Sequence, residues 1–473
     1  MQASSRHLEA GPRSVALAGT IALAVAMGIG RFAFTPLLPM MLADGVVDLH
    51  GASWLASANY LGYLIGALLC TSQPWLWARI PGLPPVEGPR LVQTGLIATG
   101  LLTLGMAVPW PAAWPALRFA AGVASSLVFI YGSAWCLARL ARQGAPALGA
   151  LMFVGPGAGI VASGLLASAM VAAHWRASTG WLVFGVLACG LGAAVLRTFS
   201  RGKVLAVGAG RESVPAVAGG ASEGGIGTAG PITAATRGTV AAHGTVVAHG
   251  VDVAHGTVVT HGTVEVGLFA FAYGLAGLGY IVTATFLPVI AREALPGSAW
   301  LDLFWPIFGA GVIVGALVSS RMRPGGDMRL LIAGAYVIQA AGIGASLVSP
   351  SLAGFVIGSL LLGLPFTALT FFAIQEVRRM RPHSAAGTTG LLTVVWSLGQ
   401  LAGPPMASWL VHRAGSAALG FTWSLEVAAS VLLSGAVLWV ALTRIYPMAR
   451  GFGGARAAAP GGGREGARGR VGR

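Results

Sequence analysis

The sequence predicts an all-helical membrane protein whose twelve transmembrane helices form two pseudo-symmetric six-helix halves. Of its 473 residues, 55% are hydrophobic and only 9% are charged, whereas about a quarter of the residues of an ordinary soluble domain carry charge. The chain also contains a series of apolar windows near the length of about 20 residues that a helix needs to cross a bilayer. An internal repeat divides these windows into two sets.

The repeat consists of small residues and prolines that recur at one offset. The matched positions, 249 residues apart, are Gly28 with Gly277, Gly30 with Gly279, Pro39 with Pro288, Gly62 with Gly311, and Gly66 with Gly315. Small residues can recur in membrane helices because they let helices pack closely, but a shared offset over several elements favours duplication. Parallel repeats of this kind are typical of secondary transporters, in which the substrate binds between the halves.

The apolar windows fall in two groups of six around a long Gly/Ala/Val-rich segment. They lie near 14–42, 50–72, 91–109, 112–138, 147–173, 179–197, 264–291, 299–320, 329–349, 352–377, 384–411 and 416–443. The predicted domains are therefore an N-terminal half (1–197), a cytoplasmic low-complexity linker (198–263), a C-terminal half (264–446) and a disordered basic tail (447–473). We interpret the first window as a retained helix rather than a cleaved signal peptide.

The positive charges predict the orientation of these helices. With the N-terminus inside, 24 of the 29 Lys and Arg residues fall in cytoplasmic segments, and three, Arg176, Arg292 and Arg413, fall outside. Lys and Arg remain on the cytoplasmic side of membrane proteins, so both termini are predicted to be cytoplasmic. The same placement explains the net charge of +15 as a consequence of membrane topology, which argues against a nucleic-acid partner.

The predicted linker contains four histidines at a six-residue period: His243, His249, His255 and His261. If the segment were extended, this even spacing would place the four histidines on one face, which suggests metal binding. A low-complexity linker without a ligand explains the pattern better, because no Cys or fixed acidic partner completes a site. We therefore expect no metal and no cofactor.

Two arginines interrupt apolar windows, where a charge costs roughly 2.5–3.5 kcal/mol on insertion scales. Arg31 lies in the first window and Arg118 in the fourth. Each could bind an anion or fix a proton relay in a cavity; alternatively, Arg31 could bind backbone carbonyls near the prolines and Arg118 could snorkel outward. Few acids are available to neutralise them, and Glu426 is the one well inside a window. The sequence thus favours a net-positive cavity for an anionic substrate.

Uncharged polar residues also occur within the windows. Asn59 and Tyr63 are four residues apart and hence on one helix face, and Gln400 lies in the eleventh window. Hydrogen bonding between helices is the favoured role for them, ahead of substrate contact. No nucleophile and base are suitably spaced for catalysis, so the sequence does not predict an enzyme.

Several motifs resemble those of the major facilitator superfamily. Arg118-x-x-x-Gly122 is similar to its fourth-helix motif, although Ala121 replaces the usual Gln, and Gly155-Pro156-x-x-Gly159 is similar to its fifth-helix motif of antiporters. The loop motif after the second helix has lost its charges following Gly66. Its counterpart after Gly315 is better kept and retains Arg321.

More narrowly, residues 28–41 and 58–63 resemble the YbfB/YjiJ-type branch of bacterial transporters. This resemblance implies a monomeric inner-membrane carrier with Arg31, Arg118 and Tyr280, the counterpart of Arg31, in its cavity. We expect proton-coupled efflux of a small organic solute by alternating access. Uptake by symport or facilitated diffusion is an alternative. An alternative from another functional class is a non-transporting membrane sensor or scaffold, but the low-complexity linker argues against it.

Overall fold

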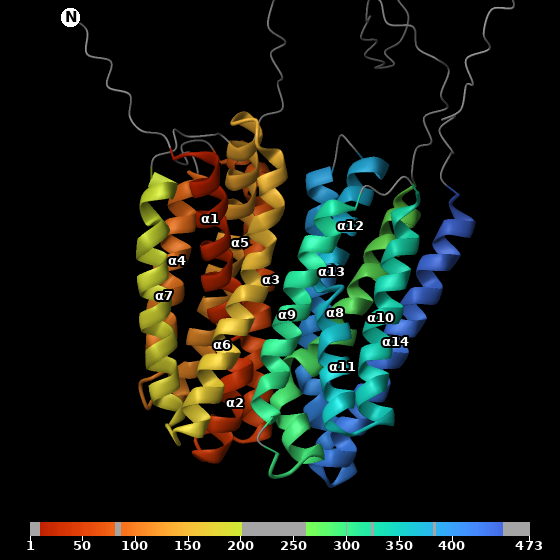
Figure 1. Cartoon of the computed structure of the whole chain (residues 1–473). Coiled ribbons are helices and arrows are strands. Elements are labelled where there is room, and N and C mark those ends of the chain that lie inside the picture. The colour runs from red at the N-terminus through yellow and green to blue at the C-terminus, as the bar shows by residue number, and fades with distance from the viewer. Residues whose placement is uncertain are drawn as a thin grey trace, which may run out of the picture. The chain divides into compact units, whose positions relative to one another are not determined.

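The computed structural model describes residues 10–80, 87–200, 262–298, 300–322, 326–381 and 385–447, and every regular element within them is helical (Figure 1). The first set of helices is α1 (Pro12–Leu23), η1 (Ala24–Ile29), α2 (Phe34–Ala43), α3 (Leu49–Arg79), α4 (Gly88–Gly105), η2 (Pro111–Ala113), α5 (Trp114–Arg142), η3 (Pro146–Phe153), α6 (Val154–Ala172) and α7 (Ala177–Ser200). The second set is α8 (Thr263–Ala294), η4 (Leu301–Leu303), α9 (Phe304–Arg321), α10 (Met328–Val348), α11 (Leu352–Gly363), α12 (Phe366–Met380), α13 (Ala385–Ala414) and α14 (Ala417–Ile445). Most of the predicted linker, its four histidines and almost all of the predicted tail lie outside the described residues.

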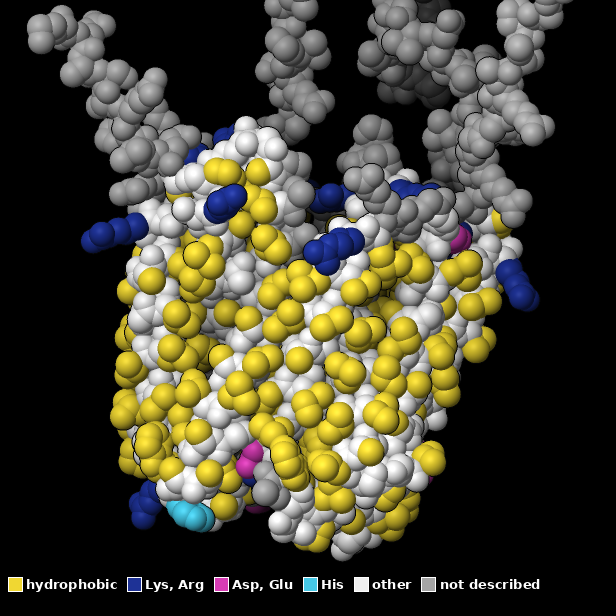
Figure 2. Space-filling model, viewed as in Figure 1, with side chains coloured by type: hydrophobic (Ala, Val, Ile, Leu, Met, Phe, Trp, Pro, Cys, Tyr) yellow, Lys and Arg dark blue, Asp and Glu magenta, His cyan; other side chains and the backbone are white. Residues whose placement is uncertain are grey.

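Ten helical stretches of the described chain are long and apolar enough to cross a membrane. The two other predicted windows also form helices, α4 and α13, but α4 carries Arg90 and Gln93 in its first two turns, and α13 carries Gln400 in its middle. On the face shown in Figure 2, apolar side chains cover the broad middle of the surface, whereas Lys and Arg lie towards its two ends. The chain is therefore a multi-pass membrane protein, and twelve crossings stay a prediction.

Short polar residues begin several of these helices. The Asp48 side chain accepts a hydrogen bond from the Gly51 backbone N–H at 2.7 Å and so caps α3. Ser351 and Ser416 cap α11 and α14 in the same way. Such caps satisfy N–H groups that the first turn of a helix leaves without partners.

The first predicted window, 14–42, is one continuous apolar stretch in the sequence but a broken helix in the structure. After α1 the backbone widens into the π-helix η1, with the Gly30 N–H bonded to the Val25 carbonyl at 2.8 Å. Regular α-helix resumes only at Phe34, and Pro36 and Pro39, which lack an N–H, follow within α2. Proline cannot complete the ladder to the residue four positions earlier, so the chain opens at residues 30–33, where Arg31 lies.

The tenth predicted window, 352–377, is also broken, at Leu364 and Pro365 between α11 and α12. A Cβ on Gly315 of α9 would lie only 1.6 Å from the Leu364 carbonyl oxygen. Gly315 therefore lets α9 press directly against this break. In the first set of helices, a Cβ on Gly66 would lie 2.0 Å from the Ser126 hydroxyl of α5, so residues at matching positions of the repeat both serve close helix packing.

Contacts between the two sets of helices join α2 to α8, α3 to α13 and α6 to α9. The Thr35 hydroxyl donates to the Ala284 carbonyl at 2.9 Å. These two residues are themselves 249 positions apart and so occupy matching places in the repeat. The sets thus meet at equivalent points of α2 and α8, beside the opening that contains Arg31.

Candidate substrate site

Arg31 lies at the opening of the first helix and is only 3% exposed. Its Nη2 donates to the side-chain oxygen of Gln400 on α13, and the Gln400 amide in turn donates to the Tyr280 hydroxyl on α8. Arg31 and Tyr280 occupy matching positions of the repeat. Gln400 therefore bridges Arg31 and Tyr280, which are different residues at matching positions of the repeat. The bridge links one set of helices to the other.

Aromatic rings surround the Arg31 guanidinium. Its central carbon lies 4.0 Å from the Tyr63 ring centre, 5.2 Å from that of Tyr60 and 5.6 Å from that of Phe32. The negative face of an aromatic ring attracts a cation at such distances. The rings therefore help to hold the charge in the interior without neutralising it.

No ion pair joins Arg31 to a carboxylate among the residues that the structure describes. Its Nε and Nη1 atoms are buried and have no hydrogen-bond partner there. Buried charges in proteins are normally paired. Nε and Nη1 of Arg31 are therefore available as donors to an anionic ligand.

Arg118 is equally buried, at 2% exposure, but its donors are engaged differently. Its two Nη atoms donate to the carbonyls of Gly30 and Arg31, each at 3.2 Å, and the Asn59 amide donates to the Arg118 carbonyl at 2.9 Å. The carbonyls that Arg118 satisfies are those released where the first helix opens. Arg118 and Asn59 therefore brace the segment that carries Arg31, in the manner expected of interhelical hydrogen bonding.

The predicted motif glycines lie at helix crossings. A Cβ on Gly155 would lie 2.3 Å from the Thr20 carbonyl oxygen, and one on Gly159 would lie 2.6 Å from that of Ala24. A Cβ on Gly122 would lie 2.1 Å from the Asn59 carbonyl oxygen. Together with the buried Pro156, these glycines bring α5 and α6 against α3 and against the broken first helix.

Two predicted residues lie apart from this group. Glu426 is exposed on α14, next to the exposed Trp423 and Val427, and Arg321 is exposed at the end of α9. Within the described ranges no three His, Cys, Asp or Glu side chains are grouped to hold a metal ion. Glu426 therefore does not neutralise Arg31 in this structure.

Sequence reasoning missed several residues of the site. Tyr60 shares a hydrogen bond of 2.9 Å with the Thr285 hydroxyl, which joins α3 to α8. The Tyr280 ring lies 5.1 Å from that of Phe366 and 5.4 Å from that of Trp396. The one available signal was the spacing of Trp396 and Gln400, four residues apart on one helix face.

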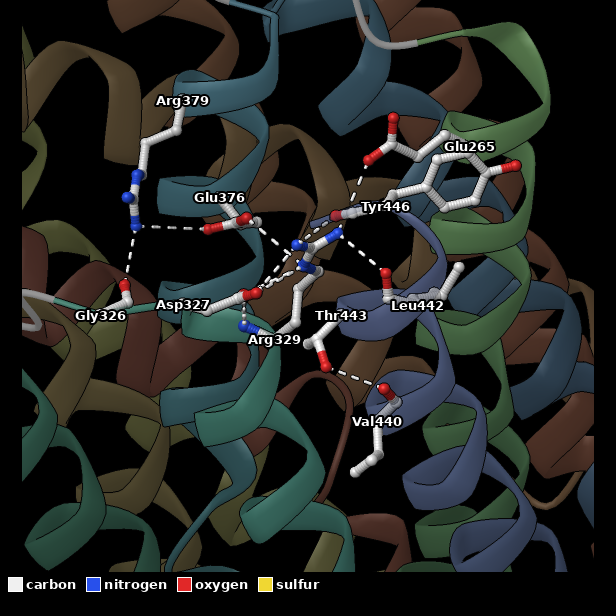
Figure 3. Close-up of polar contacts among 10 residues, drawn as sticks. All are labelled: Glu265, Gly326, Asp327, Arg329, Glu376, Arg379, Val440, Leu442, Thr443 and Tyr446. Atoms are coloured by element: carbon white, nitrogen blue, oxygen red, sulfur yellow. Dashed lines mark hydrogen bonds and ion pairs between the residues drawn. The ribbon is translucent and has the colours of Figure 1, made fainter. Parts of the chain in front are cut away.

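A third buried arginine, Arg329, lies at the N-terminal end of α10 and is 1% exposed (Figure 3). Its Nη2 lies 2.8 Å from an Asp327 carboxylate oxygen, its Nη1 lies 3.6 Å from Glu265, and its Nε lies 3.9 Å from Glu376. It also donates to the carbonyls of Leu442 at 3.3 Å and Tyr446 at 2.8 Å. We call this group the Arg329 network; it joins the ends of α8, α10, α12 and α14.

Helices packed around a buried cation, with a hydrogen-bonded bridge from one set to the other, form a framework suited to membrane transport. The sequence matches the family described as "Uncharacterised MFS-type transporter YbfB" over residues 23–216 and 234–440. The chain therefore belongs to this family of the major facilitator superfamily and is a transporter, as the sequence motifs predicted.

The fold is similar to that of a solved structure, a mutant form of the nucleoside transporter NupG. The TM-score is 0.61 at 12% sequence identity, and the match covers 90% of this chain and 99% of that one. At this identity the likeness concerns the fold alone. A comparison with curated proteins finds no match.

Proposed function

We propose that this protein is a secondary active transporter that moves a small organic anion across the bacterial inner membrane. Two six-helix halves would rock about a central site, with Arg31 binding the anion. The single observation that carries the proposal is the buried Arg31 guanidinium, which has two unpartnered nitrogens and, among the described residues, no carboxylate. Charged residues at bilayer depth commonly mark substrate pathways.

The contacts between the two sets of helices support alternating access. The segment α2 packs against α8, where Thr35 and Tyr60 bond to Ala284 and Thr285. The segment α1 packs instead against α5, α6 and α7 of its own set. With both termini cytoplasmic, as the charges predict, this arrangement fits a state closed towards the outside.

Proton-coupled efflux is the proposed direction of transport, and its support is the fifth-helix glycine motif. The glycines at 157 and 164 of that helix let α6 pack against α9, because a Cβ at these positions would lie 2.8 Å from Ile313 and 2.6 Å from Pro306. Relative movement of the two sets would therefore involve this crossing. Uptake of the same anion is the alternative direction.

The test is transport by the full-length protein in inverted membrane vesicles that carry an imposed proton gradient. We expect gradient-driven accumulation of an organic anion, with loss of transport in Arg31→Gln. Arg176→Gln is the matched control, because Arg176 is exposed and outside the site. Accumulation only in the opposite orientation would favour uptake. Failure of every organic anion to be transported, with no effect of Arg31→Gln on binding, would exclude the proposal.

A further inference from the structure

The hydrogen-bonding geometry of Arg31 narrows the kind of anion that the site could bind. A guanidinium presents two edges on which a pair of parallel N–H groups faces a carboxylate. One edge is formed by Nε and Nη2, and the other by Nη1 and Nη2. Both edges include Nη2, but each uses a different hydrogen of that nitrogen, so the hydrogen bond to Gln400 occupies only one edge.

A carboxylate can therefore bind the other edge through two hydrogen bonds. One would come from the second hydrogen of Nη2 and the other from Nε or Nη1, both of which lack partners in the described structure. The bridge from Arg31 through Gln400 to Tyr280 would stay in place, so it would hold the guanidinium in position for the anion.

Aromatic residues lie next to this bridge. We define the aromatic cluster as Phe32, Tyr280, Phe366 and Trp396. Phe366 lies 6.1 Å from Phe32 and 5.1 Å from Tyr280, and Trp396 lies 5.4 Å from Tyr280, all between ring centres. Phe32 and Tyr280 are fully enclosed, whereas Phe366 and Trp396 are only partly buried. Phe366 and Trp396 therefore retain some accessible surface.

The charge next to Arg31 suits a single negative charge. Arg118, the neighbouring buried arginine, directs both Nη atoms to the carbonyls of Gly30 and Arg31. Tyr60 and Tyr280 contribute neutral hydroxyls that are already hydrogen-bonded. A second negative charge on the ligand would find both terminal nitrogens of Arg118 engaged and only its Nε without a partner.

We propose that the transported anion is a planar aromatic monocarboxylate. Its carboxylate binds the edge of Arg31 that Gln400 leaves free, and its ring lies against Phe366 and Trp396. The proposal rests on the proposed function, because it assigns the substrate class of the same site. Rings of this kind stack on aromatic side chains in offset or edge-to-face geometry.

The experiment is a binding titration of the full-length protein in detergent with four probes. Benzoate and indole-3-carboxylate represent the class, cyclohexanecarboxylate keeps the charge without the planar ring, and benzamide keeps the ring without the charge. We expect the two aromatic carboxylates to bind at least about tenfold more tightly than the other two, a difference of about 1.4 kcal/mol. Equal binding of cyclohexanecarboxylate would overturn the aromatic assignment, and binding of benzamide as tight as that of benzoate would overturn the charge assignment.

Variants test the two contacts separately. Phe366→Leu should weaken benzoate binding, while the matched change Phe371→Leu should not, because Phe371 is a partly buried phenylalanine of the same helix that pairs with Phe372 outside the cluster. Gln400→Met should weaken binding of aromatic carboxylates, because Arg31 would no longer be held in position by its hydrogen bond to Gln400. Tighter binding in Gln400→Met would show that Gln400 competes with the ligand and would overturn this positioning role.

These outcomes separate the substrate class from the function. If an aliphatic carboxylate or a phosphonate binds best and Arg31→Gln removes that binding, the aromatic class is wrong and anion transport stands. If no organic anion binds the wild-type protein, both proposals fail together.

Discussion

Two buried arginines, Arg31 and Arg329, show what a membrane protein does with an interior cation. Both are 3% exposed or less. Arg329 lies among three carboxylates, of which the nearest is 2.8 Å away, whereas Arg31 has aromatic rings, one amide and two nitrogens without partners. A cation surrounded by acids is committed to holding helix ends together, and one without them is available to a ligand.

The largest effect should follow loss of the Arg329 charge. Arg329→Gln leaves Glu265 and Glu376 buried around a neutral side chain, and removing one partner of a buried ion pair costs about 3–5 kcal/mol. We expect a pronounced fall in melting temperature in detergent. Arg413→Gln, at an exposed position in the last turn of α13, should leave it unchanged. If Arg31→Gln destabilises the protein as much as Arg329→Gln does, the contrast between the two arginines is wrong.

The next effect concerns binding rather than stability. Arg31→Gln should lower anion affinity by roughly 10-fold to 100-fold, because hydrogen bonds to charged groups are worth about 1.5–3 kcal/mol. The melting temperature should change little, since the described structure leaves no carboxylate unpaired by this substitution. Arg31→Lys keeps the charge but not the paired N–H edge, so its affinity should fall between those of the wild type and Arg31→Gln. Full affinity in Arg31→Lys would show that charge alone suffices.

A smaller effect should follow removal of the ring nearest Arg31. Tyr63→Leu deletes a ring whose centre lies 4.0 Å from the guanidinium, and a desolvated contact of this kind contributes up to about 2 kcal/mol. Without it, Arg31 is less well held in the apo protein, so we expect a modest fall in melting temperature. An anion should then restore more stability to Tyr63→Leu than to the wild type, as measured by thermal shift. Equal shifts in both proteins would contradict this role of the ring.

The smallest effect is predicted at the edge of the Arg329 network. The Arg379 side chain is 42% exposed and lies 3.7 Å from Glu376, and it donates to the Gly326 carbonyl at 2.9 Å (Figure 3). Exposed ion pairs contribute about 0–1 kcal/mol, so Arg379→Gln should shift the melting temperature only slightly. A shift as large as that of Arg329→Gln would mean that the stability of the Arg329 network depends on its exposed member, Arg379.

The sequence predicted the helical membrane class, the positions of the helices and Arg31 as a central residue. These followed from strong local signals: apolar windows of membrane length and a charge within one of them. Gln400 and Tyr280 were also named from the sequence, but their bridge to Arg31 joins residues 369 and 120 positions apart. Only packing decides such a contact.

The remainder of the site could not be predicted because it depends on where helices open. Arg118 looked like a cavity cation, and the structure shows it bonded to the carbonyls of Gly30 and Arg31, where the first helix is broken. Phe366 and Trp396 look like ordinary core residues in a chain that is 55% hydrophobic. Glu426 was singled out for its depth along α14, but depth does not reveal which way a helix face points.

The hydrogen bond between Thr35 and Ala284 has a consequence for how the two halves could be re-engineered. Positions related by the repeat that touch each other must lie close to the axis that relates the halves, so each sees nearly the surroundings of the other. Exchanging the two residues, with Thr35→Ala and Ala284→Thr in one chain, would keep the composition and reverse the sense of the bond. The donor would come from the second half and the carbonyl from the first. At this one place, the two halves can exchange roles without a change in the atomic composition of the chain.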